Sequence, residues 1–130
     1  MKLLVDTDCL FAAYVKHDPN HTAAVALLKE HKQSGDELHI TNLVLQEVAT
    51  VFSYKIGQKE SLEFLDDIAT LGLIRITIDE DLDAASWKIF KNQTKNKTSF
   101  VDCANLTVIE KYKLDGILSF DRFYGDKLIK

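Results

Sequence analysis

The sequence predicts one α/β domain over residues 1–130, a three-layer α/β/α sandwich around a central, mainly parallel sheet of four to five strands. Two observations lead to this fold class. Short apolar runs alternate along the chain with longer segments whose apolar residues recur at helical spacing, which is typical of a parallel sheet with helices on both faces. The 130 residues also include only one proline and five glycines, so we expect no linker to divide the chain.

Four strands are expected. The first, residues 2–6, is an apolar run that stops at Asp6, and residues 37–41 form the second. Residues 73–78 alternate in polarity and are rich in β-branched side chains, which predicts the third strand. Residues 117–120 form the fourth, and the tail, residues 127–130, is a candidate for a further strand at an edge.

Helical spacing and end signals predict six helices around these strands. The helix after the first strand takes Thr7 or Asp8 as its N-cap, and the helix after the second takes Asn42. In chain order the helices are expected over residues 7–16, 22–32, 42–55, 60–71, 80–91 and 99–112. A polar connection, residues 92–98, joins the last two.

Composition and charge narrow the class of protein. The formal net charge of −4 argues against a generally basic nucleic-acid-binding surface but leaves room for a local basic patch. Cys9 and Cys103 lack a C-x-x-C spacing, so we expect reduced thiols in a cytoplasmic protein. The apolar run before Asp6 is too short for a signal peptide, and no run is long enough to span a membrane.

Two carboxylates come directly after predicted strands. Asp6 ends the first strand and Asp121 follows the fourth. If the strands are parallel, both side chains emerge at the same edge of the sheet, where open α/β sheets bind their ligands. Asp8 lies two residues after Asp6, and we expect it to be a helix N-cap.

Two further carboxylates lie on apolar helical arcs. Glu47 shares an arc with Leu43 and Val51, and an unpaired charge buried there would cost several kcal/mol. Asp102 falls between Leu106 and Ile109 on the apolar arc of the helix predicted over residues 99–112. Helices that follow strands begin at the edge that carries Asp6, so these two acids are expected near it.

Each of the four acids also has an ordinary explanation. Asp6 could cap a helix, Asp102 could complete a capping box with Ser99, Glu47 could pair with a lysine, and Asp121 could open a turn. Taken together, however, four acids that meet at one edge would repel one another without a counter-ion. Oxygen ligands without histidine or cysteine suit Mg²⁺ or Mn²⁺, which support phosphodiester hydrolysis.

A run of lysines precedes Asp102. Its members are Lys88, Lys91, Lys95 and Lys97, and no acid occurs between Asp83 and Asp102. One explanation is a solvated helix face and loop, and the other is a rim of phosphate contacts beside the metal. Arg122 is placed similarly beside Asp121, with Phe123 and Tyr124 available for base stacking or for core packing.

The ordered set of acids resembles the PIN-domain family, and most of all its small VapC-type toxins. The segments that carry the resemblance are Leu-Val-Asp-Thr-Asp around Asp6, the helix with Glu47, Ser-Phe-Val-Asp-Cys-Ala around Asp102, and Leu-Ser-Phe-Asp-Arg-Phe around Asp121. The resemblance implies a PIN-like fold and a metal-dependent endoribonuclease whose four acids, Asp6, Glu47, Asp102 and Asp121, are both catalytic residues and ligands of Mg²⁺ or Mn²⁺. It also implies an RNA substrate, a homodimer, and inhibition by a cognate antitoxin of a type II toxin–antitoxin pair.

The position of Asp8 departs from this family, because many members carry Asn or Ser there. Asp8 could join the metal shell through water or serve only as a cap. Thr7, Ser99 and Asn105 are candidates for supporting the ligands.

Two other functions stay open. Asp6-x-Asp8 resembles the nucleophile motif of haloacid-dehalogenase-type phosphatases, although Leu10 stands where that motif has Thr or Val and no downstream lysine motif follows. A catalytically inactive PIN-like module that binds RNA or protein is the second.

Overall fold

The apolar run that begins the chain is an inner strand of a four-stranded parallel sheet. The computed structural model describes residues 1–129, and its strands are β1 (Lys2–Val5), β2 (Glu37–Thr41), β3 (Ile74–Ile76) and β4 (Gly116–Leu118). Their order across the sheet is β3-β2-β1-β4, and every neighbouring pair is parallel. The predicted parallel sheet is therefore confirmed.

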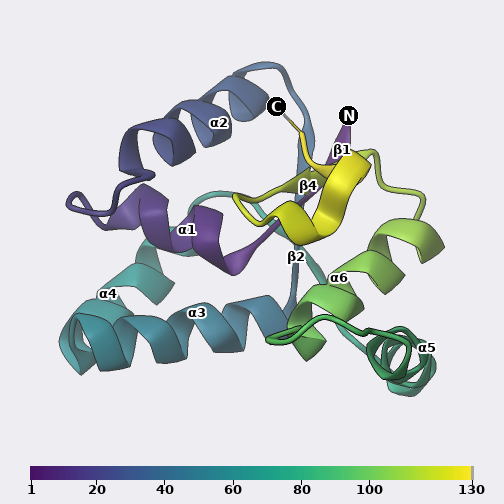
Figure 1. Ribbon diagram of the computed structural model, residues 1–130. Helices are drawn as coiled ribbons and strands as arrows, with labels where there is room; N and C mark the ends of the chain where they lie inside the picture. Colours follow the sequence, from purple (N-terminus) through teal and green to yellow (C-terminus); the bar gives the residue numbers. More distant parts are fainter. Residues whose placement is uncertain (130) are drawn as a thin grey trace.

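Within residues 1–129, six α-helices and one 3₁₀ helix cover the two faces of this sheet (Figure 1). They are α1 (Thr7–Tyr14), α2 (His21–Gln33), α3 (Asn42–Lys55), α4 (Gln58–Ile68), α5 (Glu80–Lys91), α6 (Phe100–Lys111) and η1 (Arg122–Lys127). Helices α1 to α4 pack on one face, while α5, α6 and η1 pack on the other. This arrangement is the predicted three-layer sandwich. Among residues 1–129, no helix combines the length and the apolar character that crossing a membrane requires.

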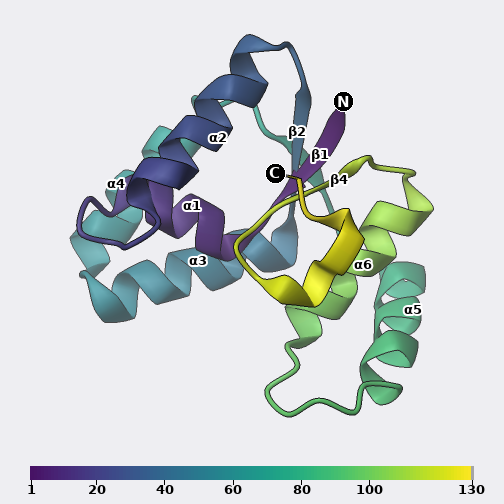
Figure 2. The same ribbon diagram turned by 45° about the horizontal axis from the view of Figure 1, so that its top comes forward.

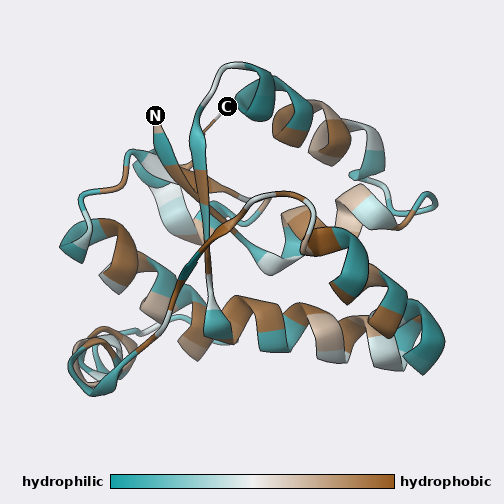
Figure 3. Cartoon of the chain, turned by 180° about the vertical axis from the view of Figure 1, so that it is seen from behind, coloured by the Kyte–Doolittle hydropathy of each residue, from teal (hydrophilic) through white to brown (hydrophobic). Residues whose placement is uncertain are grey.

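Strand β1 shows why the sequence produces two cores. Successive side chains of a strand point to opposite faces, so Leu3 and Val5 enter the core under α1 to α4 while Leu4 enters the core under α5 and α6. Both faces are covered, and all three side chains are fully buried. The hydropathy colouring shows the same division, with hydrophobic strands in the middle and helices that are hydrophobic on one side (Figure 3).

The first two strands run into helices without a connecting loop, which corrects two predicted caps. Asp6, not Asp8, caps α1, because its side chain accepts a hydrogen bond from Thr7 N. Thr41, not Asn42, caps α3 by accepting from Val44 N. With no loop between strand and helix, the last extended residue becomes the cap.

The C-terminal part differs most from the prediction. Strand β4 ends at Leu118, two residues earlier than expected, and Asp121 caps η1, which the sequence did not predict. The candidate edge strand in the tail is reduced to a single parallel bridge between Ile117 and Leu128. Lys130 lies outside the described residues. Helix α4 begins at Gln58 and β3 is shortened to three residues, which are ordinary differences at element ends.

The fold brings several element ends to one edge of the sheet. Strands β1 and β4 are parallel neighbours, so Asp6 and Ser119 emerge side by side at their carboxyl ends. Helices α1 and α3 start at this edge because they follow β1 and β2 directly. Turning the molecule shows the loop between α5 and α6 leading to the start of α6 (Figure 2).

Candidate active site

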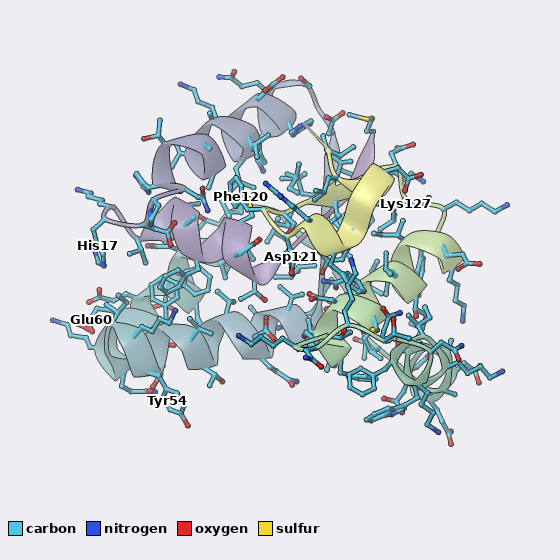
Figure 4. All side chains as sticks on the ribbon, in the orientation of Figure 1. His17, Tyr54, Glu60, Phe120, Asp121 and Lys127 are labelled. Atoms are coloured by element: carbon cyan, nitrogen blue, oxygen red, sulfur yellow. The ribbon has the colours of Figure 1, made fainter. Side chains whose placement is uncertain are left out.

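All four predicted acids line one cleft. Its volume is about 440 Å³, and Asp6, Glu47, Asp102 and Asp121 all contribute to its wall. Two more acids, Asp8 and Asp18, line the same cleft. In the stick view Asp121 lies between α1 and η1, whereas Tyr54 and Glu60 lie where α3 meets α4, away from Asp121 (Figure 4). The tertiary structure therefore gathers acids from five separate segments.

Asp6 is the most deeply buried of these acids, with 4% of its surface exposed. Its carboxylate accepts hydrogen bonds from Thr7 N at 2.9 Å, from Asn105 Nδ2 at 3.2 Å and from Ser119 Oγ at 2.8 Å. Burial, reinforced by the charge of Asp8, raises the pKa of Asp6 to about 7, although the hydrogen bonds from Ser119 and Thr7 lower it. A neighbouring cation would reverse this effect by favouring the charged form.

Asp8 has a structural role that differs from the predicted cap. It is half-buried, and its Oδ2 accepts a hydrogen bond from Phe120 N at 2.9 Å. Ser119 Oγ lies 3.2 Å from both Asp8 oxygens but only 2.8 Å from Asp6. A hydroxyl carries one hydrogen, so the shorter contact identifies Asp6 as its acceptor. Burial raises the pKa of Asp8 as well.

Asp102 occupies the first turn of α6. Burial, and then the charges of Asp121, Glu47 and Asp8, raise its pKa to about 6, while a hydrogen bond from Tyr124 opposes that rise. The capping-box alternative fails in part. Ser99 does cap α6, through Val101 N, but the Asp102 carboxylate accepts from Tyr124 Oη at 2.8 Å.

Two buried side chains connect Asp6 with Asp102. Asn105 Nδ2 donates to Asp6 Oδ1 and to Tyr124 Oη, the second at 3.0 Å, and Tyr124 Oη donates to Asp102 Oδ1. Asn105 is fully buried and Tyr124 is 2% exposed. Because both are held by packing, they fix the relative positions of the two carboxylates. Asn105 was expected to support the ligands; the bridging hydroxyl of Tyr124 was not.

Glu47 and Asp121 are the more accessible pair. Glu47 is half-buried in the middle of α3, beside Val51, which also lines the cleft. Asp121 is exposed, and its Oδ1 accepts from Phe123 N at 2.9 Å. Asp121 thus opens a turn, as its ordinary explanation held, and also lines the cleft. Neither acid joins any of the ion pairs formed within residues 1–129, so the proposed lysine partner of Glu47 is not found there.

The donor set suits a divalent cation. The cleft offers hard carboxylate oxygens, and its two most perturbed acids have raised pKa values that a cation would lower. Within residues 1–129, no three such side chains already stand close enough to hold one ion. Asp6 and Asp102 are fixed by hydrogen bonds, so binding would have to draw in the more accessible Glu47 and Asp121.

Several groups in the cleft wall or behind it, Ser119, Asp18 and Lys55 among them, were not predicted from the sequence. Ser119 could have been noticed as the polar residue in an otherwise apolar run before Asp121. Asp18 and Lys55 gave no signal, because a turn and a helix end explain them fully. Thr7 and Ser99, two of the candidates for supporting the ligands, line the cleft, and the Thr7 hydroxyl is buried without a hydrogen-bond partner in the described part of the chain.

The cysteines lie near this edge but are core residues. Both are free and buried, as expected. Burial raises the pKa of Cys9 to about 12, so its thiol stays protonated at neutral pH. A neutral thiol is a poor nucleophile, which leaves the carboxylates as the reactive groups of the cleft.

Comparisons with known proteins agree with this architecture. A family model described as PIN domain matches residues 3–124. Among solved structures, VapC20 from Mycobacterium tuberculosis, described as a Sarcin-Ricin loop cleaving toxin, is similar with a TM-score of 0.82 and 20% identity, over 95% of this chain and 93% of that one. VapBC2 from Rickettsia felis, bound to a DNA fragment from their promoter, is similar with a TM-score of 0.67 and 13% identity, over 98% of this chain and 93% of that one. A search of curated proteins finds no match.

Proposed function

This chain belongs to the PIN-domain family, and from that premise we propose that it is a divalent-metal-dependent endoribonuclease that hydrolyses RNA phosphodiester bonds. One observation carries the proposal. Acids that are far apart in the sequence line a single cleft at the carboxyl edge of the sheet, and none of them is paired with a cation within residues 1–129. Such an arrangement is costly unless a cation completes it.

In this proposal Asp6, Glu47, Asp102 and Asp121 are the catalytic residues and hold Mg²⁺ or Mn²⁺. When bound, the ion supplies polarisation of the phosphoryl group and a lowered pKa for water. Ser119 and Asn105 hold the two oxygens of Asp6, and Tyr124 holds Oδ1 of Asp102. With a pKa of about 7, Asp6 is about half protonated at neutral pH, so it must release a proton when the cation binds.

The test is cleavage of a mixed RNA pool in Mg²⁺ or Mn²⁺ by the native protein, Asp6→Asn, Asp102→Asn and a matched control, Asp66→Asn. Asp66 is an exposed acid on α4 that lines neither the cleft nor any pocket beside it. We expect cleavage by the native and control proteins, its loss in both site variants, and its loss in excess chelator. Equal cleavage by all four proteins would rule out these acids as the catalytic groups.

We further propose that the protein acts in the cytoplasm as the toxin of a type II toxin–antitoxin pair, with a cognate antitoxin as partner. The likeness to VapC20, a toxin, and to VapBC2 supports this role. We expect a short neighbouring open reading frame that encodes a DNA-binding protein. That protein, once purified, should block RNA cleavage by this chain. Absence of inhibition by that protein would count against the pairing.

A homodimer is the assembly we propose. Helix α3, the turn after it and α4 expose Tyr54, Ile56 and Leu62, with Tyr54 86% exposed, and burying these side chains against a second copy of the chain would favour association. Light scattering on the purified chain should give twice the mass of 14.7 kDa. A monomer at all concentrations would contradict the proposal.

The alternatives differ in what they predict from the same assays. A phosphatase nucleophile must reach its substrate, whereas Asp6 is buried and held by three donors, so no observation favours that function. Hydrolysis of a generic phosphomonoester, with RNA left intact, would revive it. An inactive RNA- or protein-binding module would leave RNA intact in the presence of either metal.

A further inference from the structure

We propose that a pocket beside the active-site cleft is a nucleotide subsite, in which Lys95, Lys97 and Arg122 hold a phosphate and Phe123 stacks on an unpaired base. This inference rests on the proposed function, because it concerns how RNA would reach the acids. It goes further by naming the residues beside the acids that would bind one nucleotide of that RNA.

The position of this pocket is the first argument. It has a volume of about 260 Å³ and lies between the loop of residues 92–99 and the start of η1. Lys97, Asp102 and Asp121 line both this pocket and the cleft, so the two are adjoining compartments. A strand whose scissile phosphate lay at the acids could therefore continue into the pocket with its next nucleotide.

Charge is the second argument. A polyanion that approaches a cleft lined by six acids needs positive groups close by. Lys95, Lys97 and Arg122 line the pocket, and none of them is engaged in an ion pair within residues 1–129. Their charges are free to contact phosphate, in a protein whose net charge is −4.

The structure also divides the lysine run that the sequence presented as one group. Lys95 and Lys97 line the pocket, whereas Lys88 and Lys91 lie on the exposed side of α5 and line neither the pocket nor the cleft. The two explanations of the run, a solvated helix face and a phosphate-binding rim, therefore apply to different halves of it. Lys88 and Lys91 become a matched control for Lys95 and Lys97.

Phe123 gives the pocket its preference for a base. Its half-buried ring packs edge-on against Tyr124, with ring centroids 5.4 Å apart, and Tyr124 is itself held by Asp102 and Asn105. An aromatic ring held in this way offers a stacking surface for any base. A base can reach that ring only when it is unpaired, which points to single-stranded RNA.

The test measures binding apart from cleavage. The probe is a fluorescein-labelled RNA of mixed sequence, about twelve nucleotides long, used alone and annealed to its complement, with fluorescence anisotropy read at several salt concentrations. All proteins carry Asp6→Asn to prevent cleavage, since Asp6 does not line the pocket. The variants are Lys95→Gln with Lys97→Asn, Phe123→Leu, and the control Lys88→Gln with Lys91→Gln. Asn suits position 97 because Lys97 has a φ of 65°.

We expect the Lys95/Lys97 variant to bind the single strand roughly tenfold more weakly. The slope of log binding constant against log salt concentration should fall in magnitude by about 1.4, which corresponds to the loss of two phosphate contacts. Phe123→Leu should weaken binding of the single strand roughly tenfold and leave the duplex unchanged. The Lys88/Lys91 control should match its parent. Equal losses in the two lysine variants, or an equal loss for strand and duplex in Phe123→Leu, would overturn the subsite.

Two further arms separate the outcomes. The first arm adds poly-glutamate as a competitor of the RNA. If poly-glutamate binds as tightly as RNA, and only when Lys95 and Lys97 are intact, the pocket binds an acidic polypeptide and the inference is overturned. With Asp6 restored, active Lys95/Lys97 and Phe123 variants should raise KM more than they lower kcat; unchanged KM would refute the subsite while the nuclease stands. If the single strand binds in a way that depends on Lys95, Lys97 and Phe123, but is not cleaved with Mg²⁺ or Mn²⁺, the proposed nuclease activity is refuted and the subsite stands.

Discussion

Replacement of Asp6 by asparagine is expected to stabilise the metal-free protein while it abolishes activity. The asparagine can keep the three hydrogen bonds, because its Oδ1 can accept from Thr7 N and Asn105 Nδ2 while its Nδ2 donates to Ser119 Oγ. Ser119 can then turn its own hydrogen towards Asp8. What the substitution removes is a buried negative charge.

The magnitude follows from the pKa of Asp6. A folded-state pKa of about 7, against an ordinary value of 3.8, corresponds to about 4 kcal/mol of unfavourable free energy when the carboxylate is fully ionised. The folded state holds this proton more tightly, so the stability of the native protein falls as pH rises from about 4 to about 7 and levels off above that. Because amide hydrogen bonds are weaker than those of a carboxylate, we expect a net gain of roughly 2–4 kcal/mol.

Urea and thermal unfolding in excess chelator measure this gain. At about pH 8 the Asp6→Asn variant should melt roughly 6–12 °C above the native protein, and the difference should shrink towards zero as pH is lowered to about 4. Saturating Mg²⁺ should stabilise the native protein and not the variant. Asp66→Asn should change none of these values. A variant that is less stable than the native protein at about pH 8 without metal would refute the reasoning.

Three other predictions follow from neighbouring contacts. The affinity for Mn²⁺, measured by electron paramagnetic resonance, should rise between about pH 5 and pH 8, because Asp102 with a pKa of about 6 and Asp6 with a pKa of about 7 release their protons in that range; a flat profile would contradict these values. Tyr124→Phe removes the hydroxyl that holds Asp102, and should weaken Mn²⁺ binding roughly tenfold with a stability loss of only about 1–2 kcal/mol; unchanged Mn²⁺ affinity would show that the hydroxyl does not position the ligand. Gly116→Ala should destabilise the fold by roughly 1–3 kcal/mol in urea unfolding, because the added methyl group would meet the carbonyl oxygen of Lys127 at 2.5 Å; a neutral result would mean that the tail moves freely.

Local pattern was enough to predict most of the fold. Strands β1 and β4 are short apolar runs, β3 lies in a segment of alternating polarity, and the helices show periodic burial, so the order of these elements along the chain already implies a parallel sheet covered on both faces. The failures lie where two elements meet. Asp6 displaced Asp8 as the cap of α1 because β1 enters the helix without a loop, and η1 formed between Asp121 and the tail, where no element was predicted.

The sequence by itself indicated four of the six carboxylates that line the cleft, because Glu47 and Asp102 lie on arcs that otherwise pack in the core, and Asp6 and Asp121 follow buried strands. Only the tertiary structure decided what surrounds them. Ser119 reaches Asp6 across 113 residues, and Asn105 reaches it across 99, so no local pattern records either contact. The division of the lysine run has the same origin. Periodicity reports which face of an element is buried, whereas hydrogen bonds and pockets depend on how distant elements are packed together.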